Sequence, residues 1–90
     1  MINLTQKTPI EINKDIANRI AKLRKRKKLS QKELATKAGM SFSSLKRFEQ
    51  TGEISLLSLT RIAIALEVEN ELEDIFTEVP FTSIEEIING

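Results

Sequence analysis

Two short helix patterns, separated by a single glycine, restrict the folding of this 90-residue chain most strongly. Ser30 can cap the first pattern, and Glu33 three residues later completes a capping box. Gly39 supplies the conformational freedom needed just past a helix end. Ser41 can then cap the second pattern, which Gly52 ends. The sequence therefore predicts two short helices joined by a tight turn.

The second of these helices separates apolar from polar side chains. At about 100° per residue, Leu45 and Phe48 fall on one side of an ideal helix. The other side carries Phe42, Ser43, Lys46 and Arg47. Small, polar and basic side chains on the outer face of a short capped helix suit insertion into a DNA major groove.

The chain from about residue 11 to residue 76 resembles the lambda-repressor-like helix-turn-helix family, the Cro/C1 or XRE type. The residues that carry the resemblance are Leu29-Ser30-Gln31, Leu34-Ala35, Ala38-Gly39-Met40-Ser41, Leu45, Arg47-Phe48-Glu49, Gly52, Leu59 and Ile62-Ala63-Ile64-Ala65-Leu66. The resemblance implies an all-α, compact five-helix domain. It also implies a transcriptional repressor that binds duplex DNA as a homodimer on a palindromic operator, with half-sites about 34–36 Å apart.

Within that family, the run from Arg47 to Leu56 looks most like HipB-type regulators, which are encoded beside HipA-like kinases. This resemblance implies an alternative of another class. The protein would be an antitoxin that binds and neutralises a HipA-like kinase toxin, and its DNA binding would autoregulate the operon. The two roles can coexist.

Three further helices are expected around this pair. The first begins near Thr8 and Pro9, and its apolar stripe comprises Ile12, Ile16, Ile20 and Leu23. The fourth begins at Ser55 and has an apolar face of Leu56, Leu59, Ile62, Ala63 and Leu66. A fifth, shorter helix covers about Asn70 to Phe76. The sequence thus predicts an N-terminal arm at 1–8, the helix-turn-helix domain at 9–78 and a C-terminal tail at 79–90.

The two ends leave alternatives open. Beyond Pro80, a short sixth helix would place Phe81, Ile84, Ile87 and Ile88 on one face. That face would be either a lid over the small core or a contact surface for a second subunit or another protein. The arm, in which Ile2 and Leu4 alternate with polar residues, could pair across the dimer two-fold.

Charge is divided sharply along the chain. Residues 1–52 hold 13 Lys and Arg against four Asp and Glu, a net charge of +9. Residues 53–90 hold one Arg against nine acids, a net charge of −8. The basic half contains the helix-turn-helix pattern and would attract phosphates, while the acidic half would be held away from them.

Roles within the basic half can be assigned residue by residue. We expect base contacts from Phe42, Ser43 and Arg47. The planar fork of Arg47 can bond guanine O6 and N7 together, the alternative being a phosphate contact. Phe42 departs from the polar residue usual at this place in the family. It can pack on a thymine methyl group or turn inward to extend the Leu45 stripe.

Phosphate contacts are expected from Gln31, Ser41, Ser44 and Lys46. For Gln31 they follow from the resemblance, and they would be made partly through a helix N-terminus. The resemblance also implies an ion pair between Arg24 and Glu49 that fixes the recognition helix to the first helix. The sequence leaves open whether this pair is buried or exposed.

Composition argues against several other classes of protein. The chain has no His, Cys or Tyr, which removes the commonest general bases, thiol nucleophiles and metal ligands. We therefore predict no enzyme activity, no catalytic residues, no metal site and no cofactor. No apolar run approaches the length of a membrane helix, and the first residues lack the pattern of a signal peptide. A cytoplasmic protein without a membrane partner is expected.

Overall fold

The computed structural model describes residues 6–78, which fold into five helices. They are α1 (Pro9–Arg26), α2 (Gln31–Ala38), α3 (Phe42–Thr51), α4 (Leu56–Ala65) and α5 (Glu69–Glu73). The prediction of an all-α five-helix domain is confirmed, and residues 6–78 contain no strand. The arm around Ile2 and Leu4 and the short sixth helix that could follow Pro80 lie outside the described residues.

Helix starts follow the side chains that cap them. Thr8 and Glu11 form a capping box at α1, and Ser30 and Glu33 form a second one at α2. Ser41 and Ser55 cap α3 and α4 through their hydroxyls. Each of these four helices therefore begins where the sequence places a Ser or Thr.

Three of the helices end in the same backbone turn. After α1, α2 and α4 the backbone enters the left-handed region at Lys28, Gly39 and Glu67, with φ of 58°, 67° and 62°. The following N–H then bonds back to the carbonyl five residues earlier, as in Leu29 to Arg24 at 3.1 Å. Leu29, Met40 and Val68 follow these turns and pack on the core. Each turn thus ends a helix and anchors the next segment.

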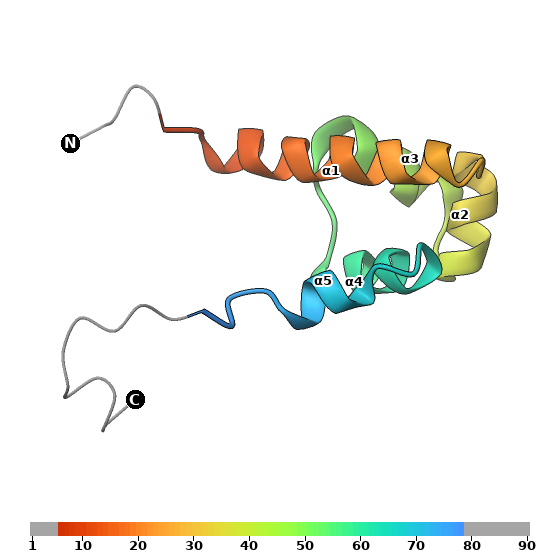
Figure 1. The fold of residues 1–90 in the computed structure, drawn as a ribbon. Coiled ribbons are helices and arrows are strands. Elements are labelled where there is room, and N and C mark those ends of the chain that lie inside the picture. The colour runs from red at the N-terminus through yellow and green to blue at the C-terminus, as the bar shows by residue number, and fades with distance from the viewer. Residues whose placement is uncertain (1–5, 79–90) are drawn as a thin grey trace, which may run out of the picture.

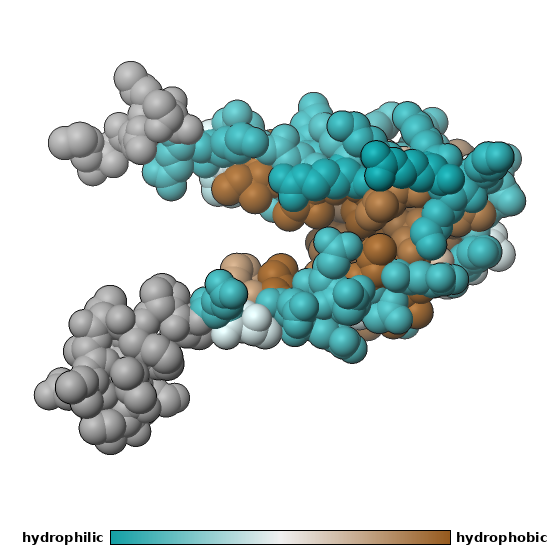
Figure 2. Space-filling view, in the orientation of Figure 1, coloured by the Kyte–Doolittle hydropathy of each residue, from teal (hydrophilic) through white to brown (hydrophobic). Residues whose placement is uncertain are grey.

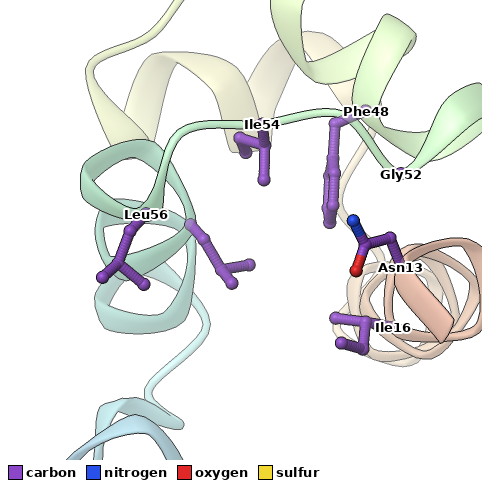
Figure 3. Close-up of a pocket in the computed structure, with 7 residues that line it drawn as sticks. Asn13, Ile16, Phe48, Gly52, Ile54 and Leu56 are labelled. Atoms are coloured by element: carbon purple, nitrogen blue, oxygen red, sulfur yellow. The ribbon is translucent and has the colours of Figure 1, made fainter. Parts of the chain in front are cut away.

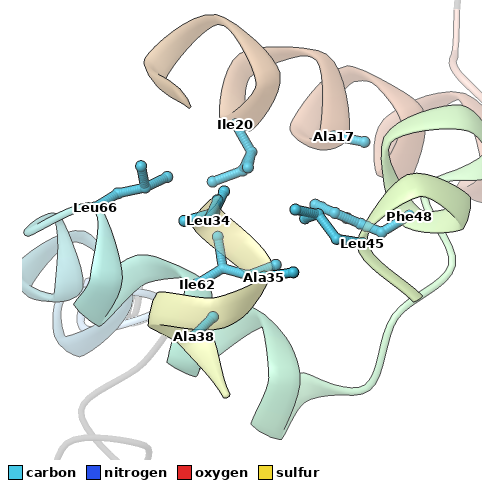
Figure 4. Close-up of a cluster of buried hydrophobic side chains, with 9 residues drawn as sticks. All are labelled: Ala17, Ile20, Leu34, Ala35, Ala38, Leu45, Phe48, Ile62 and Leu66. Atoms are coloured by element: carbon cyan, nitrogen blue, oxygen red, sulfur yellow. The ribbon is translucent and has the colours of Figure 1, made fainter. Parts of the chain in front are cut away.

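The helices pack around one core, with α1 and α3 on one side, α4 and α5 on the other, and α2 at the end between them (Figure 1). α1 packs on α3, α2 packs on both α3 and α4, and α5 packs on α4. Side chains from four helices converge in the centre (Figure 4): Ala17, Ile20, Leu34, Ala35, Ala38, Leu45, Phe48, Ile62 and Leu66. Because α2 contributes three of these residues and lies between α3 and α4, the turn around Gly39 sets the orientation of α3.

Two expectations about the apolar stripes and one about a helix boundary were wrong. Ile12 is 48% exposed and Leu56 is 72% exposed, although both were placed on buried faces. Each lies in the first turn of its helix. The helical period points these side chains toward the core side, but within residues 6–78 no neighbouring helix extends far enough to cover them. α5 spans Glu69–Glu73 and stops short of Phe76, which is 87% exposed and has a φ of 59°.

An apolar hollow runs between α1 and the α4–α5 side (Figure 2). One end is a pocket of about 180 Å³ beneath the connection from α3 to α4, lined by Asn13, Ile16, Phe48, Gly52, Ile54, Leu56 and Leu59 (Figure 3). None of the helices in residues 6–78 combines the length and apolar character required to cross a membrane.

Candidate nucleic-acid interface

α3 has one face in the core and one face at the surface. Leu45 and Phe48 are 0% and 1% exposed, and they anchor the inner face against α1 and α2. The outer face carries exposed Phe42, Ser43, Lys46 and Arg47. The structure therefore brings the three expected base-contacting residues and Lys46 together on one accessible helix face.

Hydroxyl groups gather at the start of α3. The Ser41 Oγ accepts the backbone N–H of Ser44 at 3.1 Å, which caps the helix. The same oxygen donates to the Ser44 Oγ at 2.7 Å and lies 3.3 Å from the Ser43 Oγ. All three residues are exposed, so their remaining hydrogen-bonding capacity faces solvent at the positive end of the helix dipole.

A buried ion pair fixes the far end of α3. The Arg24 Nε donates to Glu49 Oε2 at 2.8 Å, and its Nη2 donates to Glu49 Oε1 at 3.0 Å. The Nη1 of the same guanidinium donates to the carbonyl of Leu29 at 2.9 Å. The two side chains are 10% and 8% exposed. α1 and α3 are thus joined by a bidentate, largely desolvated pair.

Gln31 belongs to the same network, and sequence reasoning missed this. Its Nε2 donates to Glu49 Oε1 at 3.0 Å, so α2 also holds this carboxylate. Its side chain therefore points toward the scaffold, and its N–H at the start of α2 is the group better placed for the phosphate contact expected of Gln31. The two residues are 18 positions apart, and no helical period connects them.

A second arginine–glutamate pair lies on the outer face. The Arg47 Nε and Nη2 both donate to Glu53 Oε2, at 3.0 Å and 2.5 Å, and the side chains are 70% and 62% exposed. The Thr51 hydroxyl donates to the Arg47 carbonyl and accepts the Glu53 N–H at 3.1 Å. Because α3 ends at Gly52, the chain turns back and places Glu53 beside Arg47, a contact that the sequence did not indicate.

Phe42 lies at the surface and does not enter the core. It is 37% exposed, and two ammonium groups lie over its ring. Lys32 Nζ of α2 is 5.5 Å from the ring centroid, and Lys46 Nζ of α3 is 6.0 Å from it. The sequence left open whether Phe42 turns inward to extend the Leu45 stripe or faces outward. In the structure it faces outward.

The charge division along the sequence is only partly a division in space, because Glu53 pairs with Arg47 and Glu67 Oε2 lies 3.9 Å from Lys27 Nζ. Arg24, Lys25 and Arg26 occupy the last turn of α1, and Lys27 and Lys28 extend the basic run toward α2. Glu69, Glu71 and Glu73 lie on α5, which packs on α4 and away from α3. Among residues 6–78 no group of acids, His or Cys is arranged to hold a metal ion.

Comparison with known proteins identifies this arrangement. A sequence model described as "Helix-turn-helix" matches residues 20–69, which include all of α2, α3 and α4. No curated protein matches the chain. The matched region is more than half of the 90 residues and contains the turn at Gly39 and the outer face of α3. The chain therefore belongs to the helix-turn-helix family of the Cro/C1 type, whose members are DNA-binding proteins and typically not enzymes.

Proposed function

We propose that this protein is a sequence-specific transcriptional repressor that binds a palindromic operator as a homodimer. The observation that carries the proposal is the outer face of α3, where Ser43, Lys46 and Arg47 are exposed on a helix whose inner face is locked in the core. A rigidly mounted helix can place short side chains against base edges, while basic side chains reach phosphates.

Arg47 makes the main base contact in this proposal. Its guanidinium is exposed, and within residues 6–78 its partner is the exposed Glu53, so guanine can replace that partner with little loss of stability. A bidentate contact to guanine O6 and N7 discriminates against other bases by about 1–3 kcal/mol. Lys46, Ser41 and Ser44 then supply phosphate contacts at the helix start, and Ser43 approaches a base edge.

Dimerisation is supported by apolar side chains that are exposed within residues 6–78. Leu56, Leu57, Ile64, Ile75 and Phe76 are all more than half exposed, and they belong to α4 and to the segment around α5. Exposed apolar side chains of this kind suit a contact with another subunit or protein. One recognition helix covers few base pairs, so a second copy one helical turn away doubles the contacts.

The test begins with selection of random duplex DNA by the purified protein at near-physiological salt, followed by sequencing. An enriched palindrome with half-sites about 10 base pairs apart would support the dimeric repressor. Arg47→Ala should then weaken binding and relax the preference at one base pair per half-site. Arg61→Ala is the matched control, because Arg61 is an exposed arginine on α4. Binding that depends on salt but enriches no sequence would contradict the proposal.

A second candidate function is that of an antitoxin for a HipA-like kinase, with DNA binding as autoregulation. It is favoured by the resemblance of the run from Arg47 to Leu56 and by the exposed Ile75 and Phe76, which offer a surface to a protein partner. Co-purification of a kinase from the native host, and its loss in an Ile75→Ser/Phe76→Ser variant that still binds operator, would support this role. A protein that binds its operator tightly and retains no partner would contradict it.

A further inference from the structure

Phe42 is the one apolar side chain among the four residues on the outer face of α3, which it shares with Ser43, Lys46 and Arg47. Single exposed apolar residues are ordinary on proteins, so its 37% exposure alone indicates no ligand. Its position is more informative. Phe42 is the first residue of α3, on the face that we propose meets base edges, and the helix is fixed by a buried core and a buried ion pair.

Two lysines hold the ring in place. Lys32 Nζ comes from α2 and Lys46 Nζ comes from α3, at 5.5 Å and 6.0 Å from the ring centroid. Attraction between these cations and the ring restricts the side chain at the junction of the two helices. The two ammonium groups also bring positive charge beside the ring, where phosphates would flank the base that it contacts.

The major groove offers few partners that suit a phenyl ring. Base edges there present ring nitrogen and carbonyl acceptors and amino donors. Burying one of these polar groups against a phenyl ring removes the hydrogen bond that the group makes with water. The exception is the methyl group at C5 of thymine, which is apolar and projects into the groove. 5-Methylcytosine carries its methyl group on the same ring carbon, so it presents the same surface.

We propose that Phe42 makes this protein a sensor of the pyrimidine C5-methyl group, so that its affinity depends on whether one pyrimidine in each half-site is methylated. The inference rests on the proposed DNA binding and adds the chemical group that this part of the helix recognises. At a thymine the contact contributes to sequence preference. At a cytosine the same contact makes operator binding responsive to DNA methylation.

The experiment uses the full chain and the operator obtained by selection. Each thymine is replaced singly by uracil, which removes only the methyl group. At the position facing Phe42, a second pair of duplexes carries cytosine or 5-methylcytosine. We expect the methylated member of each pair to bind about fourfold more tightly per half-site, the factor that corresponds to burying one methyl group. In Phe42→Ala both ratios should fall to about one.

Two further variants separate this contact from general effects. Ser43→Ala, on the same face, should keep the methyl preference of the wild type. Phe42→Leu should retain most of it, because leucine is apolar but lacks the ring that the lysines contact. Since Phe42 is not part of the core, all three variants should unfold at wild-type temperature.

The outcomes distinguish the inference from the proposed function. If no duplex sequence is enriched, the proposed function fails and the inference fails with it. If a palindrome is enriched but every thymine-to-uracil change leaves the wild-type Kd unchanged, only the inference is overturned. It is also overturned if Phe42→Ala and Phe42→Leu both keep the wild-type methyl ratio, because another residue then makes the contact.

Discussion

The two faces of α3 each carry an arginine–glutamate pair, and the two pairs are built for different tasks. On the inner side, Arg24 and Glu49 are 10% and 8% exposed and are joined by two hydrogen bonds, with Gln31 as a third partner. On the outer side, Arg47 and Glu53 are 70% and 62% exposed. The first pair is held within the protein from three helices, whereas water can replace either member of the second.

This difference explains how a short helix can be fixed to the protein on one face and remain accessible to DNA on the other. A ten-residue helix is marginal by itself, so α3 must be fixed from its inner side. Leu45, Phe48 and Glu49 provide that attachment. The outer side chains are then free to exchange a weak internal partner for a base or phosphate. Substitutions on the inner side should therefore change stability first, and substitutions on the outer side should change DNA binding first.

The largest effect is expected from breaking the inner pair. Glu49→Ala removes the carboxylate that holds Arg24 and leaves a buried guanidinium with only the Leu29 carbonyl as its described partner. We expect a loss of about 3–5 kcal/mol in the free energy of unfolding, measured by urea denaturation. The matched control is Glu53→Ala on the outer side, which should change it by about 1 kcal/mol or less. An equal effect of the two substitutions would contradict the division between the faces.

The second largest effect is expected from substitution of Gly52, because the backbone at the end of α3 lies close to α1 at this residue. Its φ is 80°, and a Cβ there would lie 2.7 Å from the backbone carbon of Asn13 and 2.8 Å from the Lys14 nitrogen (Figure 3). Gly52→Ala combines this overlap with a left-handed conformation, so we expect about 2–4 kcal/mol of destabilisation by thermal or urea unfolding.

Gly39 is the matched control for Gly52. Its φ is 67°, but a Cβ would meet nothing within 4 Å. Gly39→Ala should therefore cost only the conformational term, about 1–2 kcal/mol. If the two alanine variants unfold at the same denaturant concentration, the close approach of α3 to α1 is not a determinant of stability.

The sequence predicted well those features that depend on residues close together in the chain. The predicted caps at Ser30 and Ser41 depend on groups within three residues, so their spacing in the sequence determines their contacts in the structure. The outward face of α3 followed from the helical period in the same way. Exposure of Ile12 and Leu56 did not follow, because the period gives the direction of a side chain but not the length of the surface that covers it.

Contacts between elements were mostly beyond the sequence. The pairing of Arg24 with Glu49 across 25 residues was indicated only by resemblance to a family, and the participation of Gln31 was not indicated at all. Glu53 was missed because it reaches Arg47 only after the chain turns at Gly52. Such contacts depend on how helices pack, and a periodic pattern carries no information about that.

The outer pair should affect DNA binding and leave stability nearly unchanged. Glu53→Gln weakens the hold on Arg47 and removes a negative charge from the proposed DNA-facing side. We expect operator affinity to rise by up to about fivefold, measured by fluorescence anisotropy. Glu71→Gln, an exposed acid on α5, should raise it less. A fall in affinity with Glu53→Gln would show instead that Glu53 positions the Arg47 fork for its base.

The smallest effect concerns pH and the two capping boxes, which lie at the exposed starts of α1 and α2. The pKa of Glu33 is lowered, because its carboxylate accepts the Ser30 backbone N–H at 2.9 Å, with further contributions from the Ser30 side chain and nearby Lys37. The pKa of Glu11 is lowered in the same way by Thr8.

A carboxylate whose pKa is lower in the folded state stabilises the protein at pH values above its pKa in the unfolded state. That stabilisation disappears as the pH falls through its pKa in the folded state. Stability should therefore decline as the solution is acidified below 4.5, the ordinary pKa of a glutamate carboxyl group. Glu33→Gln, whose amide oxygen can still accept the Ser30 N–H, should make that decline shallower in urea unfolding measured across this range. Glu71→Gln is the control, because it lies on α5, which has no side-chain capping hydrogen bond, and it should leave the decline as steep as in the wild type. An unaltered slope in Glu33→Gln would mean that the capping carboxylate at α2 contributes nothing to the acid sensitivity of the scaffold.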